Sequence, residues 1–171
     1  MNKTLHFHNL PLNRNNIFTL PENIASRIIY KSGDSKIYKD VVILTPGDWS
    51  DSITNAPVRY TSDELRASCN NWTKNYLNLD HNWTVLNRIG YVLNPRYVNN
   101  KVVADLQIFR ATQNGKDTIE SIEEGLINEV SVELLSTDRW DSKENVRFAT
   151  DIEFIGCAIV TEGACRETRI K

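Results

Sequence analysis

Short runs of β-branched and aromatic residues, separated by turn signals, recur along this chain and limit what it can fold into. The strict alternation over 101–109 and the apolar runs over 37–44 and 130–135 each predict a strand. Residues 147–160 predict one long strand or a bulged strand pair. We count six or more strands and two helices, joined mostly by local, hairpin-like connections. This pattern favours an α+β fold: a small, mainly antiparallel β-barrel or closed sheet with helices packed against it.

Weaker patterns cover the intervening segments. Residues 27–30 and 84–93 predict two further strands, and the Asn-Pro pair at 94–95 predicts a turn. Residues 48–60 predict a loop. A second, polar loop is expected to follow the 130–135 strand and run through Ser142.

Two segments predict helices. The run 61–64 (Thr-Ser-Asp-Glu) is a capping box, in which the threonine hydroxyl can accept from the amide of Glu64. The apolar residues that follow are spaced by four, three and four, which predicts one buried helix face: Leu65, Cys69, Trp72 and Tyr76. Residues 117–124 predict a second, short helix that Gly125 terminates.

Length and composition indicate one ordinary domain. The chain has 171 residues, 40% of them hydrophobic and 25% charged, with a net charge of −2. Lysine and arginine are scattered, so no basic field for nucleic acid is expected. Three cysteines without a Cys-x-x-Cys pair are typical of a reducing cytoplasm.

We expect a polar N-terminal arm over residues 1–24 and a single domain over residues 25–171. The N-terminus lacks the apolar core of a signal peptide, and no apolar run is long enough to span a membrane. A cytoplasmic protein without a membrane partner is therefore expected.

Two segments fifty residues apart carry the candidate chemistry. His81 follows Asn78-Leu79-Asp80 and is the only histidine outside the N-terminal arm. Histidine is the usual general base near neutral pH. Ser131 lies between two valines in the 130–135 strand, which would hold its hydroxyl rigidly. A histidine and a serine on two strands of one sheet can form a base–nucleophile pair. The alternatives are a structural histidine and a serine that fills a half-buried strand position.

A third group, an acid, would orient the imidazole. We favour Glu153 and then Asp151, which lie two positions apart on the last strand; Asp80 and Glu133 are further options. Adjacent strand residues point apart, so Asp80 reaches His81 only if the backbone turns there. The residues alone leave this choice open. No Gly-x-Ser-x-Gly elbow indicates an α/β-hydrolase.

Other constellations are weaker. His6 and His8 lack a third ligand nearby, so we expect no metal and no cofactor. Cys157 or Cys165 could replace Ser131 as nucleophile, but Cys157 sits in an apolar run and is expected to be a buried hydrophobe. The four tryptophans are spread over different elements and predict no single binding platform.

The ordered set of segments resembles the prohead (capsid maturation) serine proteases of tailed viruses, which are distantly similar in fold to herpesvirus assemblin. The resemblance covers about residues 41–164. It is carried by Leu79-Asp80-His81, the Arg-Ile-Gly-Tyr-Val strand at 88–92, the Gly-Leu-Ile-Asn-Glu-Val-Ser-Val-Glu segment at 125–133, and the last strand and its small-residue turn at 152–164.

The resemblance implies a β-barrel flanked by helices, with His81 as general base and Ser131 as nucleophile. It implies a maturation endopeptidase that cleaves scaffold and major capsid protein inside the immature shell, with a homodimer as one working form. Family members often carry an acid where this chain has Gly156. The chain ends at Lys171, so a scaffold is expected to be a separate chain or absent. The rival interpretation is a catalytically inactive protease fold kept as a virion assembly or scaffold component.

Overall fold

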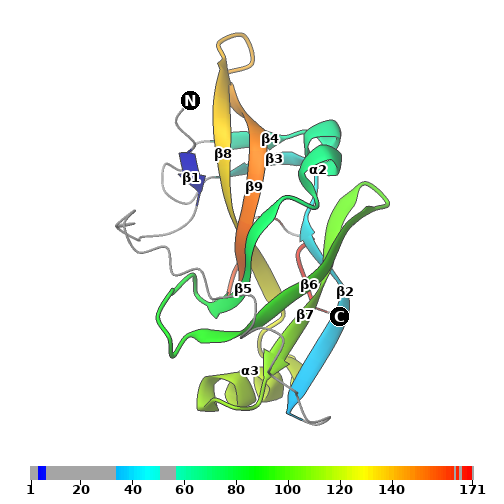
Figure 1. Cartoon of the computed structure of the whole chain (residues 1–171). Helices are drawn as coiled ribbons and strands as arrows, with labels where there is room; N and C mark the ends of the chain where they lie inside the picture. Colours follow the sequence, from blue (N-terminus) through cyan, green and yellow to red (C-terminus); the bar gives the residue numbers. More distant parts are fainter. Residues whose placement is uncertain (1–3, 7–33, 51–56, 164, 166, 171) are drawn as a thin grey trace.

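The computed structural model describes residues 4–6, 34–50, 57–163, 165 and 167–170. This part of the chain is mainly β, with two short helices (Figure 1). Its helices are α2 (Ser62–Ser68) and α3 (Gln113–Glu123). Its strands are β1 (Thr4–His6), β2 (Ser35–Leu44), β3 (Gly47–Ser50), β4 (Pro57–Tyr60), β5 (Trp72–Leu79), β6 (Arg88–Val98), β7 (Lys101–Phe109), β8 (Glu129–Asp141) and β9 (Val146–Val160).

The nine strands form one sheet in the order β1-β8-β9-β5-β6-β7-β2, with β3 attached through β4 to β9. Pairing is antiparallel except where β9 meets β4 and β5. The sheet curls until β2 lies near β8, yet no strand ladder joins these two strands in the described part of the chain (Figure 1). The expectation of a closed barrel is therefore wrong, because the sheet is an open half-barrel.

The core lies inside this curl and under the two helices. Its largest fully buried side chains come from nearly every long element, and they include Leu65 of α2, Ile119 of α3, Leu106 of β7 and Phe154 of β9. Burial of one such side chain stabilises the fold by about 1.5–3 kcal/mol. Trp72 stacks on Phe154 with ring centroids 4.9 Å apart, which fastens β5 to β9.

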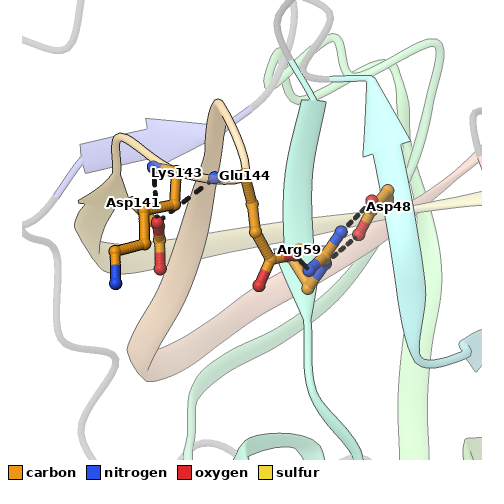
Figure 2. A network of polar contacts seen from close by, with 5 residues as sticks. All are labelled: Asp48, Arg59, Asp141, Lys143 and Glu144. Atoms are coloured by element: carbon orange, nitrogen blue, oxygen red, sulfur yellow. Dashed lines mark hydrogen bonds and ion pairs between the residues drawn. The ribbon is translucent and has the colours of Figure 1, made fainter.

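The strands β8 and β9 form a long hairpin that projects beyond the core (Figure 1). Two register shifts interrupt their pairing, one of them between Glu133 and Leu134. Such bulges increase twist and re-aim side chains. Near the hairpin tip, Arg59 of β4 donates two hydrogen bonds, of 2.6 and 2.7 Å, to the Asp48 carboxylate of β3, and it also forms an ion pair with Glu144 (Figure 2). In the hairpin turn, the Asp141 carboxylate accepts from the amides of Lys143 and Glu144.

The capping box at the start of α2 is confirmed in part. Thr61 accepts from the amide of Glu64 at 3.3 Å, but the Glu64 carboxylate instead accepts from the Ser68 hydroxyl and the Ile152 amide. The predicted length is wrong, because α2 ends at Ser68 and both Trp72 and Tyr76 belong to strand β5. The spacing of these residues fits a helix face, but it also fits one face of a strand. The parallel pairing of this segment with β9 makes it a strand.

Several boundaries also differ. The 48–60 segment contains strands β3 and β4 rather than a loop alone, with residues 51–56 outside the described part. Residues 94–95 form a bulge inside β6 instead of a turn, and β8 continues to Asp141 where a loop was expected. Helix α3 starts four residues early, but its end is as predicted, since Gly125 follows it with a φ of 73°. The predicted strand at 27–30 lies outside the described residues.

The predicted N-terminal arm is described only at Thr4–His6, where β1 pairs with β8. Among the described residues, the helices are all too short or too polar to cross a membrane.

Candidate functional site

His81 sits in a tight turn at the end of β5. The Asn82 amide donates to the Leu79 carbonyl at 2.8 Å, and the two residues between them, Asp80 and His81, have φ values of 47° and 55°. Positive φ at both central positions is the signature of a type I′ turn. Non-glycine residues tolerate this conformation only at a cost, and such strain concentrates at functional sites. The backbone does turn at Asp80, and the turn directs the histidine back over the sheet.

The imidazole of His81 contacts a buried carboxylate. Its Nδ1 lies 3.1 Å from Oε1 of Glu133, and the side chain of His81 is only 7% exposed. Glu133 is fully buried, and its second oxygen accepts from Nδ2 of Asn78 at 3.3 Å. An ionised Glu133 can only accept, and Nδ1 is then the donor of this hydrogen bond. Nε2 is then the ring nitrogen that can take a proton from a nucleophile.

Ser131 lies on the same face of the sheet as this pair. Ser131 and Glu133 are two positions apart on β8, so their side chains point to one side with their backbones about 7 Å apart. Across the strands, Ser131 pairs with Ala158 of β9, which pairs with Asn78 of β5. Three residues from distant parts of the chain thus form one row. Only the methyl group of Ala158 separates the serine from the asparagine in this row.

Gly156 makes room for the buried acid. It pairs with Glu133 across β8 and β9, and a Cβ added at Gly156 would lie 2.8 Å from Oε2 of Glu133. The same Cβ would press on the Tyr76 carbonyl at 2.7 Å. The carboxylate of Glu133 therefore occupies the space that a side chain at position 156 would need. The acid Glu133 on β8 therefore lies next to position 156 on β9, where members of the prohead protease family often have an acid.

The two acids favoured from the sequence lie farther along the hairpin. Glu153 pairs with Leu135, which lies two residues after Glu133 on β8. Asp151 is exposed at a bulge in β9, where its φ is 51°. The acid that touches the ring is Glu133, which sequence reasoning kept only as an option. One sequence signal could have identified Glu133 as this acid. Ser131 and Glu133 are two positions apart on one predicted strand, and residues with that spacing share a face.

Cys157 is poorly placed as an alternative nucleophile. It pairs with Val132 and Leu77, so it faces the side of the sheet opposite Ser131, and it is fully buried. Burial raises the pKa of the Cys157 thiol well above its ordinary value, and the charge of Glu133 adds to the rise. A thiol with a raised pKa is rarely the reactive thiolate.

Two other sequence candidates stay untested. His6 lies in β1, but His8 falls outside the described residues. Cys165 is buried, with its sulfur 3.3 Å from the Thr45 hydroxyl.

Comparison with known proteins identifies a structural relative but no sequence relative. No protein-family model matches the sequence, and no curated protein matches it. Among solved structures, the fold is similar to that of the bacteriophage T4 capsid assembly protease, gp21. The TM-score is 0.50 at 12% sequence identity, and the match covers 75% of this chain and 98% of that one. At this identity the likeness establishes a shared, capsid-protease-like fold. The likeness to herpesvirus assemblin stays a prediction.

Proposed function

We propose that this protein is a serine endopeptidase of viral prohead maturation, with Ser131 as nucleophile, His81 as general base and Glu133 as the acid that orients the ring. The observation that carries the proposal is the buried hydrogen bond between His81 and Glu133, beside Ser131 on one face of the sheet. The fold shared with a phage capsid assembly protease supports the same assignment. Glu153 and Asp151 give way to Glu133 because of that contact.

The proposed chemistry follows from which ring nitrogen is protonated. With Nδ1–H donated to Glu133, Nε2 of His81 accepts the Ser131 proton as Oγ bonds to the peptide carbonyl carbon. The imidazolium then returns the proton to the leaving amine as the C–N bond breaks. Water, deprotonated by the same nitrogen, releases the acyl group and restores the serine. Glu133 holds the ring in one tautomer and stabilises its positive charge.

The proposed substrates are scaffold and major capsid proteins, cut inside the immature shell. The structural neighbour is named a capsid assembly protease, and that name is the basis for this part of the proposal. The expectation that the enzyme can work as a homodimer comes only from the family resemblance of the sequence.

The test compares Ser131→Ala with wild type and with Ser136→Ala. Ser136 lies on the same strand but on the opposite face, where its hydroxyl donates to Asp138 at 2.8 Å. Each protein is co-expressed with its virus's own capsid and scaffold proteins, and mass spectrometry reads their termini. Trimmed termini with wild type and Ser136→Ala, but not with Ser131→Ala, support the proposal. Equal trimming by all three, or by none, refutes it and favours an inactive assembly component.

A fluorophosphonate probe gives a substrate-independent measurement. An activated serine displaces fluoride and forms an Oγ–P bond, with its proton passing to the base, so the protein gains a defined mass. We expect labelling at Ser131 alone, and its loss in His81→Ala. Labelling elsewhere, or undiminished labelling in His81→Ala, would contradict the assigned roles.

A further inference from the structure

We propose that Asn78 is a positioning residue, which holds the Glu133 carboxylate so that its other oxygen stays aimed at His81. The inference rests on the proposed function for its catalytic consequence. The structural part of the inference is that the amide of Asn78 fixes the Glu133 carboxylate and, through it, the His81 ring. This part depends only on the observed contacts. Asn78 touches neither the ring nor the serine in any contact described here, so its effect passes through Glu133.

The orientation of the Asn78 amide follows from its surroundings. Oε1 of Glu133 is taken by His81, and Oε2 can only accept, so the NH2 group of Asn78 must face it. This orientation leaves Oδ1 of Asn78 buried and without a hydrogen-bond partner among the described residues. A buried, unpaired acceptor is costly and rare in native proteins, and it needs an explanation.

The free-energy cost of the unpaired Oδ1 offsets the stabilisation from the hydrogen bond to Glu133. A hydrogen bond to a charged group and an orphaned buried acceptor have free energies of similar size and opposite sign. Asn78 therefore adds little net stability for a fully buried polar residue. A leucine of similar size would remove the orphaned Oδ1 but would leave Oε2 of Glu133 without its described donor. A role in holding Glu133 explains why the chain carries an amide there.

The backbone around Asn78 is fixed on both sides. Its strand, β5, lies inside the sheet, and Asn78 pairs with Ala158 of β9 and with Arg88 of β6. The Glu133 carboxylate fills the space at Gly156, so that neighbour has no side chain that could donate to the carboxylate or fix its rotation. The Asn78 amide is the described contact that holds Oε2, and so it leaves Oε1 directed at the ring.

The test uses Asn78→Leu and Asn78→Asp, with Asn75→Leu as the matched control. Asn75 lies on the same strand but is exposed, and its side chain donates to the Val92 carbonyl. Leucine removes the donor, and aspartate sets a second carboxylate against Glu133, where two negative charges cannot both be accommodated. Gly156→Ala is not used, because its Cβ would also press on the backbone of Tyr76.

The first measurement is the rate of fluorophosphonate labelling at Ser131. We expect both Asn78 variants to be labelled about 10- to 100-fold more slowly, the size of effect seen when the hydrogen-bond partners behind metal-binding histidines are lost. Asn75→Leu should match wild type. The thermal midpoint of Asn78→Leu should fall, because a buried carboxylate oxygen loses its donor, so the labelling rate is measured on folded protein. A merely structural residue would lower the midpoint and leave that rate unchanged.

The second measurement is ring 15N NMR of His81, assigned by its loss in His81→Gln. Wild type should give a single neutral tautomer protonated at Nδ1, and Asn78→Leu should give a mixture of tautomers. Unchanged ring shifts together with an unchanged labelling rate in Asn78→Leu would overturn the inference while leaving the proposed function intact. If wild type is never labelled, the proposed function fails, and the ring spectra alone decide the role of Asn78.

Discussion

Replacement of Glu133 by glutamine changes only one atom and one charge at the centre of the candidate site. In wild type the carboxylate accepts from Nδ1 of His81 at 3.1 Å and from Nδ2 of Asn78 at 3.3 Å. A glutamine has one oxygen and one NH2 group in their place. If the oxygen faces His81, the NH2 group meets the NH2 group of Asn78. The Asn78 amide can then turn over, because its Oδ1 has no described partner and is able to accept.

In this turned-over arrangement the new glutamine is paired with both neighbours, and one group of Asn78 stays unpartnered as in wild type, now the NH2 group instead of Oδ1. Glu133→Gln should therefore fold with a free energy of unfolding within about 1 kcal/mol of wild type. The ring keeps its tautomer, but its positive charge in the transition state loses the carboxylate. A charge-assisted hydrogen bond is worth about 1.5–3 kcal/mol. At about 1.4 kcal/mol per factor of ten, the rate should fall roughly 10- to 150-fold.

The assay is the rate of fluorophosphonate labelling at Ser131, with urea unfolding of the same samples. A loss of roughly 10⁴-fold would mean that the amide had forced the ring into the wrong tautomer, as in the Ser-His-Asp proteases. No loss would mean that Glu133 does not serve His81 during reaction. Either result would refute the reasoning. The variant Glu133→Gln combined with Asn78→Leu, in which no amide can turn over, should be less stable than Glu133→Gln alone.

Two further predictions concern groups outside the candidate site. Burial works to raise the pKa of Asp105, but hydrogen bonds from Asn94, the Asp40 amide and Arg96 outweigh it and hold that pKa below its usual 3.8. A lowered pKa stabilises the fold at neutral pH, and the contribution is lost as the pH falls through the folded-state pKa. Asp105→Asn should therefore cost about 2 kcal/mol at pH 7 in urea unfolding, and this cost should shrink as the pH is lowered through the folded-state pKa; an equal cost at pH 7 and at pH 2 would contradict this. Because burial raises the pKa of the Cys157 thiol, iodoacetamide at pH 7.5 should leave this residue unmodified in the folded protein and modify it in urea, as peptide mass spectrometry can check.

Much of the fold was predictable because strand patterns are local. The alternation over Lys101–Phe109 marks β7 with its observed bounds, and the glycine at 125 marks the end of α3. The failures came where two local patterns overlapped. Trp72 and Tyr76 match a helix as well as a strand, and the ladder between β5 and β9, distant in sequence, decided for the strand. Propensity is a weak prior against such tertiary pairing.

The sequence by itself determined the residue types and their order: a histidine, the only one outside the N-terminal arm, before a strand-like run, a serine between valines, and an acid two positions beyond that serine. Because side chains alternate along a strand, it also determined that Ser131 and Glu133 share a face if the strand is regular. Only the tertiary structure decided which acid meets the ring. That choice depends on the turn at His81, on the register of β8 against β9 and β5, and on the space at Gly156. Register between strands far apart in the chain is set by the packing of the whole sheet and its bulges, and no local pattern encodes it.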